Sequence, residues 1–96
     1  MNEFNLELHN KVIAQIEREP DTWDQFVWRE GNRRCYGSWA KELNTVVLEH
    51  KYDYPSAKRV LGLTNLEAHY AFDPDRTLEE LKNLPEYIKS NRENPK

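Results

Sequence analysis

The sequence is poor in several residues and patterns on which whole classes of protein depend. It contains a single cysteine, Cys35, and no long apolar run. One thiol cannot form an internal disulfide, and small exported domains are usually rich in disulfides. The first eight residues include acidic and amide side chains, whereas an export signal begins with basic residues followed by an apolar run. A membrane helix needs about 20 apolar residues, and the sequence contains no run of that length. We therefore expect a soluble, cytoplasmic protein that does not bind a membrane.

Glycine is scarce, and an excess of positive charge is missing. The only glycines are Gly31, Gly37 and Gly62, and they do not form a phosphate-binding loop. The net charge is -3, whereas neutralising nucleic-acid phosphates usually requires a strong basic excess. The three histidines stand far apart and lack the spacing of a zinc site. We expect no metal, no cofactor and no enzymatic activity.

Aromatic residues are what the chain does have. They make up 11% of it, and all three tryptophans fall within residues 23–39. Each large ring can bury about 150–250 Å², and a chain of this length can build one compact core. We predict a single domain over residues 1–90. Residues 91–96 have nothing to bury and are predicted to be a frayed tail.

The first half of the chain predicts three short helices. Apolar residues recur at spacings of three and four over residues 6–18, which predicts a helix that Pro20 ends. A second short helix is predicted over residues 22–28, and a third from residue 36 or 38 to 43. The apolar residues Val46–Leu48 predict either a short strand or an extension of that helix.

The second half has clearer boundaries. Pro55 suits the first turn of a helix, and Gly62 suits the left-handed position after its end. Capping boxes begin at Thr64 and at Thr77, each with a glutamate three residues later. The last helix is predicted to reach residue 88 with a kink at Pro85. The fold class is therefore all-α: a compact domain of five or six short helices, with at most one short strand.

One segment carries the strongest functional hypothesis. Residues 28–39 combine aromatic and basic side chains, which are enriched where proteins bind one another. Arginine also stacks on tryptophan and tyrosine. The alternative is that the tryptophans belong to the core and the arginines to a solvated turn. The predicted partner-binding residues are Trp28, Arg29, Arg33, Arg34 and Tyr36.

Two other hypotheses stay open. Residues 56–72 have the outline of a helix-turn-helix, which would make the protein a DNA-binding transcriptional regulator. Cys35 lies beside two arginines and a predicted helix start, which together lower a thiol pKa. With one of the three histidines as a base it would serve a thiol-dependent enzyme. The alternative is a buried, inert cysteine.

A set of residues from the first to the last predicted helix agrees in order and spacing with the pattern of a known family. They are Pro20, Thr22, Trp23, Asp24, Gln25, Gly31, Cys35, Trp39, Ala40, Leu61, Gly62, Leu63, Thr64, Glu67, Ala68, Phe72, Thr77, Leu78 and Leu81. On these residues the chain resembles a family of small, mostly uncharacterised proteins of bacteriophages and bacteria, over about residues 12 to 84. Glu30 stands in place of the family's first cysteine, so a role that needs two thiols is not expected.

The resemblance implies a helical fold and a phage or mobile-element origin, and it supplies no mechanism. Combined with the aromatic and basic segment, it leads to one principal hypothesis. The protein is expected to be a small, phage-type interaction protein that acts in the host cytoplasm. It would bind a host protein or complex and modulate it, with inhibition as the expected effect.

Overall fold

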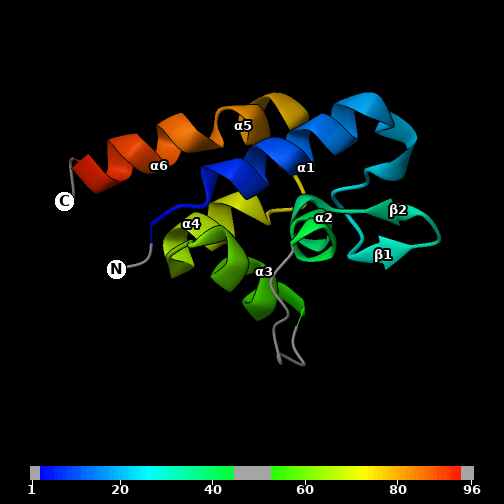
Figure 1. Ribbon diagram of the computed structural model, residues 1–96, viewed down its shortest axis with the longest axis horizontal. Coiled ribbons are helices and arrows are strands. Elements are labelled where there is room, and N and C mark those ends of the chain that lie inside the picture. Colours follow the sequence, from blue (N-terminus) through cyan, green and yellow to red (C-terminus); the bar gives the residue numbers. More distant parts are fainter. Residues whose placement is uncertain (1–2, 45–52, 94–96) are drawn as a thin grey trace.

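The computed structural model describes residues 3–44 and 53–93, which form six α-helices and one small hairpin (Figure 1). The all-α class is confirmed, while the strand considered at Val46–Leu48 lies outside the described residues. The elements are α1 (Leu6–Arg18), the 3₁₀ turn η1 (Pro20–Thr22), β1 (Arg29–Glu30), β2 (Arg33–Arg34), α2 (Tyr36–Leu43), α3 (Asp53–Leu61), α4 (Asn65–Ala71), α5 (Leu78–Lys82) and α6 (Leu84–Glu93).

Helix α1 forms the centre of the core, and its bounds are those predicted from the sequence. It begins where the Asn5 side chain accepts a hydrogen bond from the amide of Leu8. In Figure 1 it runs between α5 and α6 on one side and α2 and α3 on the other. An ion pair between Glu17 and Lys82 joins α1 to α5. The apolar core residues are Leu8, Val12, Ile13, Ile16, Tyr36, Ala40, Leu61, Leu63, Ala68, Ala71, Leu81, Leu84 and Ile88.

The helix predicted over residues 22–28 is wrong. After η1 the chain forms a loop that Gln25 holds in place. The buried amide of Gln25 donates to the carbonyl oxygens of Ala71 and Asp73, and its oxygen accepts from the amide of Tyr36. These partners lie far away in the sequence, and the four bonds that Gln25 makes in all fix it outside a helix. Tertiary hydrogen bonds therefore override the local helical pattern here.

A two-stranded antiparallel hairpin follows this loop. Glu30 pairs with Arg33 across the two-residue loop Gly31–Asn32. Gly31 has a φ of 61°, and the first loop position of a type II′ turn requires such a value. The hairpin is therefore made possible by one glycine.

Both predicted capping boxes are confirmed. Thr64 accepts from the amide of Glu67 while the Glu67 carboxylate accepts from the amide of Thr64, and the same exchange joins Thr77 and Glu80. Arg76 pairs with Glu80 at 2.7 Å. The structure thus uses these acidic side chains to begin helices.

The C-terminal helix extends beyond the predicted tail boundary at residue 90, since α6 continues to Glu93. Arg92 fixes this end: its guanidinium donates to the Glu67 carboxylate at 2.7 and 2.9 Å and to the Gly62 carbonyl at 2.8 Å. Burial alone would raise the pKa of Glu67, but the bonds from Arg92 and the Thr64 amide outweigh it and lower that pKa. Arg92 therefore joins α6 to the turn between α3 and α4.

We expect Arg92→Met to lower the free energy of unfolding by about 2 kcal/mol, because it leaves the buried Glu67 carboxylate without its charged donor. Adding Glu67→Gln should recover part of this loss, since glutamine also completes a capping box. Urea denaturation followed by circular dichroism measures both effects. Lys89→Met, an exposed position on the same helix, is the matched control. Equal stabilities of the Arg92→Met and Lys89→Met variants would contradict the proposed bridge.

Within the described residues, no helix has both the length and the apolar character needed to cross a membrane.

Candidate functional site

The hairpin arginines are largely occupied by internal partners. Arg33 pairs with Glu30 at 2.7 Å and with Asp24 at 3.6 Å. Arg34 is 15% exposed and pairs with Glu42. Arg29 is exposed, and no ion pair within the described residues involves it. Of the three predicted binding arginines, only Arg29 therefore presents an uncompensated charge.

Tyr36 does not belong to a surface site, and its prediction as a partner-binding residue is wrong. The side chain is fully buried at the start of α2, and its hydroxyl lies 2.8 Å from Nδ1 of His9. Burial raises the pKa of Tyr36 and lowers the pKa of His9 to about 4. An aromatic ring is equally suited to a core and to an interface, and here the contact with α1 places it in the core.

The two later tryptophans have different environments. Trp39 packs against the core, and its indole nitrogen donates to the carbonyl oxygen of Thr22 at 2.9 Å. Trp28 is half-buried, and its ring meets Tyr54 of α3 edge-on, with the ring centroids 4.7 Å apart. Tyr54 in turn lies 5.5 Å from Phe72. Trp28 therefore begins an aromatic row that runs from the loop before the hairpin to the end of α4.

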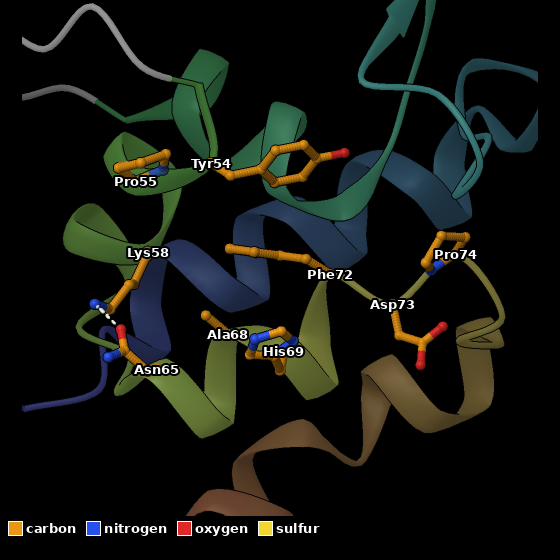
Figure 2. A pocket seen from close by; sticks show the side chains of 9 residues that line it. All are labelled: Tyr54, Pro55, Lys58, Asn65, Ala68, His69, Phe72, Asp73 and Pro74. Atoms are coloured by element: carbon orange, nitrogen blue, oxygen red, sulfur yellow. Dashed lines mark hydrogen bonds between the residues drawn. The ribbon is translucent and has the colours of Figure 1, made fainter.

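This aromatic row leads into a groove between α3 and α4 with a volume of about 790 Å³. Figure 2 shows Tyr54 and Pro55 of α3 along one side, Ala68 and His69 of α4 along the other, and Phe72 between them. Tyr54 is 41% exposed. Binding sites are commonly concave and mainly apolar with a few polar groups, and this groove matches that description. We call it the α3–α4 groove.

The polar residues of the α3–α4 groove lie at its ends. Lys58 and Asn65, joined by a hydrogen bond, lie at one end, and Asp73 and Pro74 lie at the other (Figure 2). No carboxylate among the described residues pairs with Lys58, whereas Asp73 pairs with Arg76 at 3.3 Å. The groove is thus apolar in its middle, with an uncompensated cation at one end.

Cys35 lies at the N-cap of α2 but is buried, with 1% of its surface exposed. Burial raises the pKa of its thiol and outweighs the lowering effect of nearby hydrogen bonds. Its sulfur lies 3.8 Å from the Tyr54 hydroxyl. The two arginines that precede it have other partners. These features favour an inert thiol over a nucleophile.

The hairpin of α3 and α4 is present, with Gly62 at a φ of 70° between the helices. A recognition helix reads bases with arginine, lysine, asparagine or glutamine. The sequence of α4 contains neither arginine nor lysine, and its exposed residues are Asn65, Leu66 and His69. Leu66, 79% exposed, would face the nucleic acid. The hairpin therefore has the shape of a DNA-binding unit without its usual side chains.

The described histidines and acidic residues do not gather into a metal-binding group. Among residues 3–44 and 53–93, no set of three histidine, cysteine, aspartate or glutamate side chains is placed to hold an ion. His9 is in the core, His69 lines the α3–α4 groove, and His50 lies outside the described residues.

Comparison of the sequence with protein-family models and curated proteins, and of the structure with solved structures, gives no match.

Of the predicted site residues, only Trp28 lies against the α3–α4 groove through its contact with Tyr54. Sequence reasoning missed Tyr54, Phe72 and the two prolines because a groove is produced by how two helices approach each other. The one local signal was Tyr54-Pro55 at a helix start, an exposed aromatic beside a rigid residue.

Proposed function

We propose that this protein is a binding module that recognises a segment of another protein in the α3–α4 groove. The resemblance to phage and bacterial proteins suggests a host protein or complex as the partner, with inhibition as the result of binding. The observation that carries the proposal is the aromatic groove itself, whose wall residue Tyr54 is 41% exposed although it contacts two other rings.

Three features support binding over turnover. The groove combines a large apolar area with few polar groups, which suits the anchoring side chain of a protein ligand. The one thiol is buried, and the described histidines are not paired with it. Pro55 and Pro74 lie at the groove, and the restricted backbone of proline limits the entropy lost on binding.

Peptides selected from a random library displayed on phage provide the test. We expect Tyr54→Ala to weaken the binding of selected peptides by about 30-fold, as loss of a central aromatic anchor does. His69→Ala, at an exposed position for which no polar contact is seen within residues 3–44 and 53–93, should weaken binding by about 5-fold. Fluorescence anisotropy measures these affinities, with circular dichroism showing that each variant is folded.

Leu66→Ala is the matched control, because Leu66 is an exposed apolar residue of α4 that does not line the groove. Its affinity for the peptides should equal that of the wild type. Peptides whose affinity is the same for wild type, Tyr54→Ala and His69→Ala would contradict the proposal. A selection that yields no specific peptide would contradict it equally.

A further inference from the structure

The α3–α4 groove does not end at Pro74. A second hollow of about 460 Å³ begins there and runs between the loop before the hairpin and the start of α5. Pro74 lines both hollows, so they meet at this residue. The lining of the second hollow includes Leu78 and Phe26, and Phe26 at 74% is the most exposed of the phenylalanine, tyrosine and tryptophan side chains among the described residues.

The unpaired charges of the two hollows have opposite signs, with a cation in the first and a carboxylate in the second. Lys58, at the far end of the first groove, has a hydrogen bond to Asn65 but no carboxylate partner among the described residues. Asp75, beyond Pro74, is exposed, and no cation of the described residues pairs with it. The other charged residues that line the surface are already compensated, since Asp24, Asp73 and Arg76 all take part in ion pairs.

We propose that the ligand is an extended segment of a partner protein that crosses Pro74 and carries opposite charges at its two ends. This inference rests on the proposed function. An acidic residue of the segment pairs with Lys58, an apolar side chain lies on Phe72 and Tyr54, and a second apolar side chain contacts Phe26. A basic residue pairs with Asp75. Complementary charges fix the register of such a segment more than they add affinity, and the aromatic contacts supply most of the affinity.

The length of the surface is consistent with a short peptide. The longest dimension of the described molecule is 40 Å. An extended peptide of about 12 residues spans roughly 40 Å, so a library of that length covers both hollows at once.

Charge-reversal variants test the inference. Selection on the wild type should enrich an apolar residue with an acidic residue on one side and a basic residue on the other. Peptides selected on Lys58→Glu should carry a basic residue in place of the acidic one, with the apolar residue and the other basic residue unchanged. Peptides selected on Asp75→Lys should carry an acidic residue in place of the basic one, with the apolar residue and the first acidic residue unchanged. Each reversal should weaken binding of wild-type-selected peptides by about 10-fold, and the matching exchange in the peptide should restore it.

Each variant has a matched control of the same charge on the same or the next helix. Arg59 is an exposed cation beside Lys58, and Glu79 is an exposed carboxylate of α5, and neither lines a hollow. Arg59→Glu and Glu79→Lys should leave the selected sequences unchanged. Phe26→Ala should weaken binding of the wild-type-selected peptides by about 10-fold, since the ligand is proposed to reach beyond Pro74.

The outcomes separate this inference from the proposed function. Peptides that depend on Tyr54 but show no charge preference, or whose preference does not follow the reversals, overturn the charged-segment inference alone. Peptides that do not depend on Tyr54 overturn the proposed function. A wild-type chain that dimerises in analytical ultracentrifugation, with Tyr54→Ala restoring the monomer, identifies a second copy as the occupant and overturns the inference.

Discussion

Gly62→Ala is expected to lower the free energy of unfolding by about 4 kcal/mol, which corresponds to a fall in Tm of roughly 16–32 °C for a domain of this size. Two effects add. Gly62 has a φ of 70°, where a residue with a side chain is strained by about 1 kcal/mol. A Cβ at this position would also lie 2.0 Å from the carbonyl oxygen of Glu3, which is backbone and cannot rotate away.

The second effect extends beyond the contact itself. The segment at Glu3 leads directly to Asn5, whose amide and side chain donate to the carbonyl oxygens of Leu61 and Val60 at the end of α3. Moving Glu3 away from a new methyl group would disturb these bonds, each of which contributes about 1 kcal/mol. The expected loss therefore exceeds the strain of the backbone angle.

Gly31→Ala is the matched control for this substitution. Gly31 has a similar φ of 61°, but apart from its two chain neighbours no described residue lies within 4 Å of an added Cβ. Its replacement should cost only the backbone strain of about 1 kcal/mol. Thermal unfolding of both variants by circular dichroism or calorimetry gives the comparison. Equal losses of stability for the two glycine variants would contradict the prediction that the close approach of Glu3 to Gly62 adds to the cost of the substitution.

The second large effect is a loss of stability in acid caused by His9. The pKa of His9 is lowered from 6.5 to about 4 by burial. The unfolded chain therefore binds a proton at His9 more readily than the folded protein does. The stabilisation by neutral His9 is fully present above pH 6.5 and should be lost as the pH falls from 6.5 to about 4. Below about pH 4, the contribution of His9 to the free energy of unfolding should no longer change. The difference amounts to about 3 kcal/mol.

His9→Asn separates this effect from the titration of carboxylates. The asparagine oxygen can accept the Tyr36 hydroxyl in place of Nδ1, and the side chain carries no proton equilibrium in this range. The variant is expected to be less stable than the wild type at pH 7.5, since it fills less of the core, and the gap should narrow by about 3 kcal/mol towards pH 4. Urea denaturation of both proteins at a series of pH values measures this difference in the free energy of unfolding. A gap that stays constant with pH would contradict a buried, neutral His9.

The candidate site shows where a sequence stops being informative. Of the partner-binding residues predicted within 28–36, Tyr36 lies in the core, while Trp28 contacts Tyr54 and Arg29 is exposed. Arg33 forms ion pairs with Asp24 and Glu30, and Arg34 forms an ion pair with Glu42. Whether a charged side chain is available for a partner depends on which opposite charges the fold brings near it, and spacing along the chain does not reveal that.

The sequence by itself determined the features that depend only on residues within one or two helical turns of one another. The ends of α1, the capping boxes at Thr64 and Thr77, and the left-handed Gly62 all depend on hydrogen bonds or backbone angles between residues at most a few positions apart. Such interactions are the same in any tertiary context, so their residues predict them.

The tertiary structure alone decided the rest. Gln25 turned a predicted helix into a loop by bonding to Ala71, 46 positions away. Tyr36 became core because His9 of α1 lies opposite its hydroxyl, and Arg92 extended α6 because Glu67 is within reach. The groove lined by Tyr54 and Phe72 exists only because α3 and α4 meet at Gly62. Contacts between distant residues depend on how the helices pack, and the fold of this protein as one compact helical domain is what brings them together.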